Sequence, residues 1–363
     1  MTSPYAIALS HFPAFGPRTY VRLFECLRDY GAIWNAGADE LQGAGISALT
    51  IEKFLAWRQQ TDPQKLAADV AALGIQTIDR DDVSFPEALK TIFDPPIILY
   101  VRGQLPKAHQ MIGIVGSRDA TEYGLRTARQ FSSELTQAGL VVVSGLARGI
   151  DVAAHVGAMS VGGKTIAVLA HGHEQLKGSK RDFGNTIIEQ GGALITEQPP
   201  HMVALNYHFP IRNRIIAGLS CGVLIVEAKL PSGTLHTAQA AINAHREVFA
   251  IPGPIDVPTS VGTNKLLQDG AHVTTSTNDI LIVLGFPAQK VLKPSLTTPV
   301  RDVSSSPDEA ILLPHLSSSP THVDELARNS GLSTSQVLGT LTILEIHGKV
   351  RPLGQMYYIL DKR

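Results

Sequence analysis

Several loops of this 363-residue chain combine glycine, hydroxyl side chains and arginine in a way that suits the binding of phosphate groups. In the first loop Gly116 allows a tight turn, Ser117 and the start of the following helix offer hydrogen-bond donors, and Arg118 adds a fork-shaped cation. The G-x-G-x-x-G fingerprint of dinucleotide-binding folds is not found here. The loop therefore predicts an anion site, with a structural ion pair of Arg118 as the alternative.

A second loop, residues 144–149 with the sequence SGLARG, places glycines around the predicted start of a helix, where the backbone can come close to a ligand. Asp151 and His155 follow, four residues apart on one helix face. With Ser144 they could suggest a hydrolytic triad, but the segment does not resemble a nucleophile elbow. We therefore expect Asp151 to stabilise the helix start and His155 to be hydrogen-bonded nearby.

A third segment, residues 209–214 with the sequence FPIRNR, opens a predicted helix. Two arginines and an asparagine within one turn, with an aromatic residue just before them, suit phosphates and a stacked base. The alternative is that Phe209 belongs to the core and that Arg214 pairs with Glu227.

Two more loops have the same character. Residues 232–234 (SGT) follow a predicted strand and open a helix, and the segment 251–254 (IPGP) precedes the glycine-containing turn at 262–264 (GTN). Five such loops are too many for one mononucleotide. A ligand with several phosphates in a row explains them more economically.

Two polar clusters carry less weight. His171, His173 and Glu174 resemble metal ligands, but no further partner stands at a known spacing, so a polar loop is the better interpretation. Residues 177–181 (KGSKR) form a basic loop that could face nucleic acid, although most such runs are simply solvated.

The elements that must position these loops follow an α/β pattern over residues 71–285. Runs of Val, Ile and Leu alternate with amphipathic helices, which predicts a parallel sheet covered on both faces, with ligands at the carboxyl ends of the strands. The predicted strands are Ile112–Val115, Leu140–Val143, Thr165–Leu169, Ala193–Thr196, Val223–Val226 and Val248–Ile251, and predicted helices include Tyr123–Ala138 and Leu235–Ala244.

The flanking segments have different patterns. Residues 1–70 are predicted to be helical, with a Gly-x-Gly turn at 41–46 that resembles a helix-hairpin-helix or, with more weight, is an ordinary helical turn. Residues 286–307, rich in proline and serine, predict a linker. Residues 308–363 predict a winged helix, built from helices at Asp308–His315, Thr321–Ser330 and Thr334–His347 and a hairpin of Val350–Pro352 with Met356–Leu360.

The bulk composition limits the class of protein. The formal net charge is -1, so nucleic-acid binding would require a local basic face. Cys26 and Cys221 stand far apart in apolar stretches, which predicts two buried thiols and neither a disulfide framework nor a Cys-rich zinc site. A signal peptide is not indicated, and no apolar run reaches the roughly 18 residues that span a bilayer. We expect a cytoplasmic protein without membrane contact.

Taken together, the motifs resemble those of the DNA-processing protein A family (DprA, also called Smf). They run in order over about residues 71–285, as GSR at 116–118, SGxAxGID at 144–151, GKTIAVL at 163–169, FPxRNR at 209–214, and Glu227-Ala228 with Ser232-Gly233. The helical N-terminal domain and the winged helix fit the longer members of that family. The sequence departs from the family's pattern at Leu176-Lys177-Gly178, where a Tyr-Pro pair is common.

This resemblance implies an extended Rossmann-like fold and a cytoplasmic protein that binds single-stranded DNA. It also implies loading of the recombinase RecA onto that DNA during natural transformation and recombination, and a homodimer built through the Rossmann domain. It implies no catalytic activity, and we expect no cofactor or metal. The residues predicted to contact DNA, from the loops and the resemblance together, are Gly116, Ser117, Arg118, Ser144, Gly145, Arg148, Gly149, Lys164, Phe209, Arg212, Asn213, Arg214, Ser232, Gly233 and Thr234.

Three alternatives stay open. Phosphoribohydrolase-like Rossmann enzymes use similar loops with a catalytic glutamate, for which Glu227 is the candidate. A structural adaptor would bind DNA only incidentally. The winged helix offers few cations, with Lys349 and Arg351 only at the end of its predicted recognition helix, so a role in binding a partner is as plausible as DNA contact.

Overall fold

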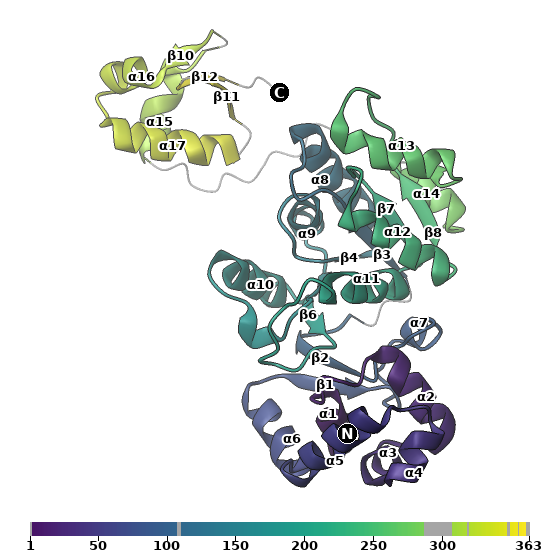
Figure 1. The fold of residues 1–363 in the computed structure, drawn as a ribbon. Coiled ribbons are helices and arrows are strands. Elements are labelled where there is room, and N and C mark those ends of the chain that lie inside the picture. Colours follow the sequence, from purple (N-terminus) through teal and green to yellow (C-terminus); the bar gives the residue numbers. More distant parts are fainter. Residues whose placement is uncertain are drawn as a thin grey trace. The chain divides into compact units, whose positions relative to one another are not determined.

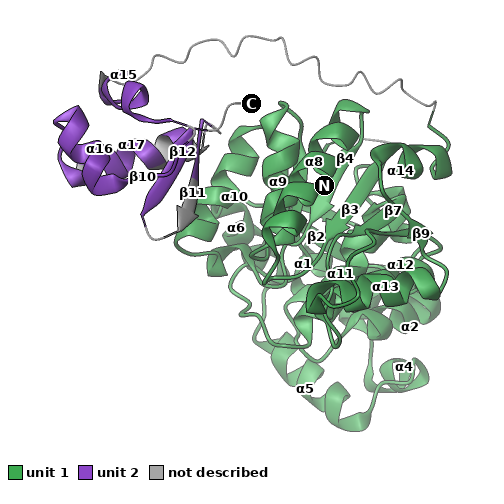
Figure 2. Cartoon of the chain, turned by 90° about the horizontal axis from the view of Figure 1, so that it is seen from above, with its two compact units in different colours: residues 1–289 green, residues 290–363 purple. Residues whose placement is uncertain are grey.

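The computed structural model describes residues 2–106, 110–286, 307–317, 319–346, 349–354 and 356–360. The chain forms two compact units, residues 1–289 and residues 290–363 (Figure 2). Each unit has hydrophobic clusters of its own. The predicted linker, residues 286–307, falls almost wholly outside the described residues, and the other predicted domain boundaries remain predictions.

The first unit begins with a helical part built around aromatic side chains. Its helices are α1 (Pro4–Ser10), α2 (Pro17–Leu27), α3 (Tyr30–Asn35), α4 (Ala38–Gly43), α5 (Ala48–Gln59) and α6 (Pro63–Ala72). Asp29, Ser47 and Asp62 cap α3, α5 and α6 by accepting hydrogen bonds from backbone N–H groups of the first turn. Phe12 and Phe54 pack in the centre with ring centroids 5.2 Å apart, within a cluster that extends to β2.

The centre of the first unit is a nine-stranded sheet with the order β1-β2-β6-β5-β4-β3-β7-β8-β9 (Figure 1). The strands are β1 (Gln76–Asp79), β2 (Ile98–Gly103), β3 (Met111–Val115), β4 (Val141–Ser144), β5 (Thr165–Val168), β6 (Ala193–Thr196), β7 (Gly222–Ile225), β8 (Glu247–Ala250) and β9 (His272–Val273). The strands from β3 to β9 are parallel, whereas β1 and β2 pair antiparallel with each other and β2 pairs antiparallel with β6. The chain order reverses between β3 and β7, where Val115 pairs with Ile225. Such a reversal opens a crevice at the carboxyl ends of the strands.

Helices cover both faces of this sheet because successive strand residues point to opposite sides. They are α7 (Glu87–Lys90), α8 (Glu122–Gln137), α9 (Ile150–Ser160), α10 (Ser179–Glu189), α11 (His208–Leu219), α12 (Gly233–Asn243), α13 (Val261–Gln268) and α14 (Thr277–Val283), with short 3-10 turns η1 (His173–Gln175) and η2 (Pro258–Ser260). Ile112 and Ile114 of β3 face α8, α9 and α14, whereas Met111 and Val115 face α11 and α12. This alternation buries both faces of one strand.

The predicted α/β fold class is confirmed, and each of the six predicted strands is present within a residue or two of its predicted bounds. The antiparallel strands β1 and β2 were not predicted, because they lie outside the strand–helix alternation on which the prediction rested. The prediction of two buried thiols is wrong for Cys26, which is exposed on the outer face of α2, while Cys221 is partly buried. No described helix is both long enough and apolar enough to cross a membrane.

The second unit is the predicted winged helix. Its elements are α15 (Pro307–Leu312), the 3-10 turn η3 (Leu313–His315), β10 (Thr321–His322), α16 (Val323–Ser330), α17 (Thr334–Ile346), β11 (Val350–Gly354) and β12 (Tyr357–Leu360). Leu326, Leu341 and Leu344 belong to its core. Thr321 was predicted to begin a helix, but it pairs with Tyr358 of β12, so the hairpin becomes a three-stranded sheet.

Candidate nucleic-acid interface

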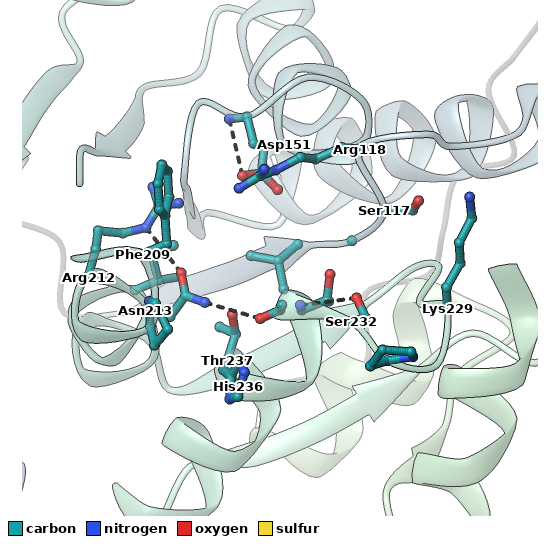
Figure 3. Close-up of a pocket in the computed structure, with 18 residues that line it drawn as sticks. Ser117, Arg118, Asp151, Phe209, Arg212, Asn213, Lys229, Ser232, His236 and Thr237 are labelled. Carbon is teal, nitrogen blue, oxygen red and sulfur yellow. Dashed lines mark hydrogen bonds between the residues drawn. The ribbon is translucent and has the colours of Figure 1, made fainter. Parts of the chain in front are cut away.

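A pocket of about 310 Å³ lies at the carboxyl ends of the strands, where the strand order reverses. We call it the switch-point pocket. Figure 3 shows side chains from the loops after β3 and β7 and from α11 converging on it. The predicted residues that line it are Gly116, Ser117, Arg118, Phe209, Arg212, Asn213, Ser232, Gly233 and Thr234. The sequence motifs therefore meet in space although up to about a third of the chain separates them.

Two glycines allow the loops after β3 and β4 to pack closely against each other. A side chain at Gly116 would meet Ile150 Cγ1 at 2.6 Å. Gly149 has a φ of +87°, and a Cβ there would lie 2.3 Å from the carbonyl oxygen of Ser117. Both positions therefore require glycine for close approach of one loop to the other. This contact fixes the position of the backbone that carries Arg118.

Arg118 is exposed and stacks over Phe209, with the guanidinium carbon 5.2 Å from the ring centroid. No described carboxylate forms an ion pair with it within 4.0 Å, so the alternative of a structural ion pair is not observed among these residues. The guanidinium of Arg118 can donate two hydrogen bonds to a phosphate, and the ring of Phe209 beside it offers a surface on which a base can stack.

Arg212 and Asn213 form the floor of the pocket and are both buried. Arg212 Nη1 donates to the carbonyl oxygen of Gly145 at 2.6 Å and also to that of Val168. Its Nε donates to Asn213 Oδ1 at 3.1 Å. Burial lowers the pKa of Arg212 to about 10, and the nearby Asp151 opposes this shift. The guanidinium thus ties two strand ends together and keeps its positive charge beneath the pocket.

Asp151 lines the same pocket, and Gly145 lies against Arg212. Asp151 Oδ2 accepts hydrogen bonds from the backbone N–H groups of Gly145 at 3.2 Å and of Ala147 at 3.3 Å, so it holds the loop that leads into α9 and does not cap the helix itself. Burial raises the pKa of Asp151, although Arg212 and the backbone donors lower it. A side chain at Gly145 would overlap the Arg212 guanidinium at 2.4 Å, so this glycine makes room for the arginine.

Arg214 does not reach the pocket. Its guanidinium is buried and forms ion pairs with Glu197 and, at 3.7 Å, with Asp94. Two residues along a helix turn the side chain by about 200°, so Arg212 and Arg214 point to opposite sides of α11. The prediction that Arg214 contacts the ligand is therefore not supported by its position. Arg214 forms a structural ion pair, as the alternative interpretation of the sequence expected, but its partner is Glu197 and not Glu227.

Glu227 is a structural cap. Its carboxylate accepts hydrogen bonds from the backbone N–H of Thr121 at 2.9 Å, from the Thr121 hydroxyl at 2.5 Å and from the Thr259 hydroxyl at 3.2 Å. A Cβ at Gly124 would lie 2.5 Å from the Glu227 carboxyl carbon, so this glycine admits the carboxylate to the start of α8. Glu227 is buried and holds the loops that follow β3 and β8 together.

A second pocket of about 180 Å³ lies over the ends of β4 and β5 and is lined by Gly145, Arg148, His171 and Lys180. Arg118, Phe209 and Arg212 line both pockets. The two pockets are therefore neighbouring parts of one depression, which we call the carboxyl-edge groove. Arg148 is exposed within it and pairs with Asp119.

Three predicted residues lie elsewhere. The hydroxyl of Ser144 is buried and donates to the carbonyl oxygen of Ile114 at 2.6 Å. Gly149 lines a neighbouring groove rather than these two pockets. Lys164 is exposed just before the first residue of β5, at the opposite edge of the sheet from the groove, because carboxyl ends of parallel strands share one edge. The structure therefore does not bring Lys164 together with Arg118.

The switch-point pocket is also lined by three residues that are not among the predicted DNA contacts, Lys229, His236 and Thr237 (Figure 3). Lys229 is exposed, and Nζ lies 3.7 Å from Asp119 Oδ2. Their position in the sequence could have identified them, because Lys229 and His236 flank the predicted loop at 232–234. The whole segment between the strand and the helix was therefore a candidate for the pocket.

The histidine cluster of the loop after β5 is not a metal site. His173 is buried, and its Nε2 donates to the carbonyl oxygen of Tyr100 at 3.0 Å. Burial lowers the pKa of His173 to about 4. Among the described residues no group of His, Cys, Asp and Glu side chains could hold a metal ion.

Fold and groove define the class of protein: a Rossmann-type domain with an arginine-lined groove at the carboxyl edge of its sheet, joined to a winged-helix domain. A family described as "DNA recombination-mediator protein A" matches residues 76–285, and one described as "DprA winged helix domain" matches residues 297–356. The chain therefore belongs to the DNA recombination-mediator protein A family, the DprA/Smf proteins, which confirms the resemblance seen in its motifs.

Individual relatives agree with this assignment. The chain is 36% identical over 332 residues to Protein Smf of Escherichia coli, covering 89% of this chain and 87% of that protein. The crystal structure of DNA processing protein A from Streptococcus pneumoniae matches with a TM-score of 0.68 and 31% identity, over 77% of this chain and 98% of that one. DNA processing protein A from Helicobacter pylori, described for its single-stranded DNA binding mode, matches with a TM-score of 0.52 and 27% identity, over 58% and 95%.

Proposed function

We propose that this protein binds single-stranded DNA along the carboxyl-edge groove. The observation that carries the proposal is Arg118, which has no ion-pair partner among the described residues and stacks on Phe209 where the two pockets meet. A base can stack on the exposed part of the aromatic ring, while the arginine holds a phosphate. The related protein from Helicobacter pylori, described as binding single-stranded DNA, supports the choice of ligand.

The shape of the groove favours a strand over a single nucleotide. One pocket offers Ser117, Lys229 and the N-terminus of α12, and the other offers Arg148 and Lys180. Arg118 stands between them. Successive phosphates of a flexible strand can reach donors on both sides of Arg118, whereas one mononucleotide would use only one side. Because these donors are charges and backbone groups, we expect little sequence preference.

Substitution of Arg118 by alanine tests the proposal. We expect the affinity for oligo-dT to fall about tenfold or more, because the variant loses both a phosphate contact and the cation above Phe209. Fluorescence anisotropy with labelled oligo-dT measures the loss. Arg126→Ala is a matched control, because Arg126 also lies over an aromatic ring, that of Tyr123, but is not part of the groove. An unchanged dissociation constant for Arg118→Ala, in a folded variant, would contradict the assignment.

We also infer that the protein works by binding and not by catalysis. The candidate catalytic residue of the phosphoribohydrolase-like alternative is Glu227, whose carboxylate is buried and accepts three hydrogen bonds within the fold. Incubation with nucleoside monophosphates, followed by chromatography for released base, tests this inference. Turnover that disappears in Glu227→Ala, in a variant that keeps its fold, would favour the enzyme.

The wider role follows from the family. We propose that the protein loads the recombinase RecA onto single-stranded DNA during transformation and recombination, in the cytoplasm. Family membership supports this role. RecA filament assembly on DNA precoated with single-strand-binding protein, with and without this chain, is the test. Arg118→Ala should fail to stimulate assembly at concentrations where the wild-type chain is active.

We propose further that the chain forms a homodimer through the Rossmann domain. The short strand β9 lies at the edge of the sheet, and apolar side chains are exposed on it and on the following helix, as Val273 (59% exposed), Ile282 (63%) and Val283 (39%). An uncovered edge strand with exposed apolar side chains favours association. Light scattering of the wild-type chain and of Ile282→Glu, which should be monomeric, tests the proposal. A monomeric wild-type chain would contradict it.

A further inference from the structure

A third groove, with a volume of about 800 Å³, lies beside the carboxyl-edge groove, between α8, α9 and the start of α10. We call it the α9 groove. In Figure 1 α8 and α9 lie next to each other, and residues of the two helices are in contact. The α9 groove shares Arg118, Arg148 and Lys180 with the carboxyl-edge groove, so the two depressions are continuous.

The floor of the α9 groove is aliphatic. Leu125 of α8 and Val152, Ala153 and Val156 of α9 line it, and Val156 is 38% exposed. Val152 and Val156 are four residues apart, so they stand one above the other on the same face of α9. The result is an apolar stripe open to solvent along a helix, the kind of surface that receives the apolar face of another helix.

The rim of the groove is basic. Arg118, Arg129, Arg148 and Lys180 surround the aliphatic floor, and Asp119 is the single carboxylate among the described residues that line the groove. Asp119 already pairs with Arg148 and lies near Lys229. Arg118, Arg129 and Lys180 form no ion pair with any described carboxylate within 4.0 Å. A segment that combines apolar side chains with carboxylates would satisfy floor and rim together.

We propose that the α9 groove binds a short acidic, amphipathic segment of a partner protein. The aliphatic floor favours a protein segment over DNA bases, which stack on flat aromatic faces such as that of Phe209 in the neighbouring groove. Phe183, the aromatic residue of the α9 groove, is half-buried and packs edge-on against His155 with centroids 6.2 Å apart. Charge complementarity with the rim selects carboxylates on the partner.

The shared cations couple this segment to the strand in the carboxyl-edge groove, a step that rests on the proposed function. Arg118, Arg148 and Lys180 can serve a phosphate or a carboxylate, but one cation cannot satisfy both fully. The acidic segment therefore lowers the affinity for single-stranded DNA, and DNA lowers the affinity for the segment by the same factor. A partner that carries such a segment would promote release of the strand.

Binding of a synthetic peptide tests the site without DNA. The probe is a labelled peptide with leucines on one helix face flanked by glutamates, and its scrambled version is the control. Saturable binding by fluorescence anisotropy is expected, with a preference for the amphipathic order. Arg129→Ala should weaken it about 2- to 5-fold, because an exposed ion pair contributes little. Val156→Glu should weaken it at least about tenfold, because it places a like charge on the floor.

Two control variants separate the groove from general surface effects. Val83→Glu changes a valine that is 98% exposed and lies outside the groove, and Arg126→Ala removes a cation from α8 outside the lining. Neither should alter peptide binding. Equal binding of amphipathic and scrambled peptides, or peptide binding unaffected by Val156→Glu, overturns the proposal.

A second measurement with oligo-dT distinguishes this proposal from the proposed function. The peptide should compete with oligo-dT on the wild-type chain, whereas Val156→Ser, which weakens the apolar floor without adding a charge, should bind oligo-dT normally and resist competition. If Val156→Ser weakens oligo-dT binding and the peptide does not bind, the α9 groove is an extension of the DNA path and the partner proposal fails. If the peptide binds but oligo-dT does not, the proposed function fails and the partner site stands.

Discussion

At the scale of single residues, the buried histidine His155 shows how the hydrogen-bond network selects one protonation state. The Thr165 hydroxyl donates to the carbonyl oxygen of Val142 at 2.7 Å, so it can only accept from His155 Nδ1, which lies 2.8 Å away. Nε2 of His155 is buried and has no hydrogen-bond partner among the residues that the structure describes. A proton there would place an uncompensated charge in the core, and burial accordingly lowers the pKa of His155 to about 3.

This arrangement predicts a loss of stability in mild acid. In the unfolded chain His155 and His173 take up a proton near the ordinary pKa of 6.5, whereas in the folded protein they do so only near about 3 and about 4. The stability present above pH 6.5 is therefore lost as the pH falls, by about 1.4 kcal/mol per pH unit for each histidine. Urea unfolding of the wild-type chain between pH 7 and pH about 4.5 measures this slope.

A variant assigns the slope to a residue. His155→Gln cannot be protonated, so its unfolding free energy should depend less steeply on pH over the same range, whatever its stability at pH 7. Parallel pH curves for His155→Gln and the wild-type chain would show that His155 is not the group responsible.

At the scale of elements, the loop between β4 and α9 depends on Gly149 for two separate reasons. Its φ of +87° is unfavourable for any residue with a side chain, and a Cβ would also meet the Ser117 carbonyl oxygen at 2.3 Å. We expect Gly149→Ala to lower the free energy of unfolding by about 3 kcal/mol, as strain and overlap add. It should weaken oligo-dT binding as well, because the displaced backbone carries Arg118.

Gly162→Ala separates the two reasons. Gly162 has a φ of +74°, but a Cβ there would meet nothing within 4 Å. This variant should lose only about 1 kcal/mol, the cost of the left-handed backbone alone. Denaturant titration of both variants supplies the comparison. If Gly149→Ala and Gly162→Ala lose the same stability, the close contact with the Ser117 carbonyl does not matter to the fold.

At the scale of the whole molecule, a chain of net charge -1 needs a local set of cations to bind DNA, and the proposed set lies along the carboxyl edge of its sheet. The affinity for oligo-dT should fall with salt, with a log–log slope of roughly -0.7 for each phosphate neutralised. Removing Arg118 should make the slope shallower by about that amount. A salt titration of the wild-type chain and of Arg118→Ala measures both slopes. An identical slope would show that Arg118 does not contact a phosphate.

The winged-helix unit should contribute little to this binding. All residues of the carboxyl-edge groove lie in the first unit. In the second unit Lys349 Nζ lies 3.5 Å from Glu309 Oε2, so one of the two cations near the end of α17 has a carboxylate partner. Residues 1–289 alone should therefore bind oligo-dT within about threefold of the full chain. A tenfold or greater loss on truncation would assign a direct DNA contact to the winged helix.

The amino-acid sequence by itself determined the elements and the character of the loops. The alternation of apolar strands with helices, the glycines at Gly116 and Gly149, and the arginine Arg118 are local signals, because side-chain periodicity and backbone freedom act over a few residues. The antiparallel strands β1 and β2 were not predicted from these local signals, because neither strand belongs to a strand–helix–strand unit.

Only the tertiary structure decided which side chains share the groove. Arg212 and Arg214 are two residues apart in the motif, but they point to opposite sides of α11. Arg212 lies at the floor of the pocket, whereas Arg214 pairs with Glu197. Strand direction leaves Lys164 at the far edge of the sheet, while the reversal between β3 and β7 brings Lys229 into the same pocket as Arg118. Strand order and helix rotation depend on contacts between distant segments, and no local pattern encodes them.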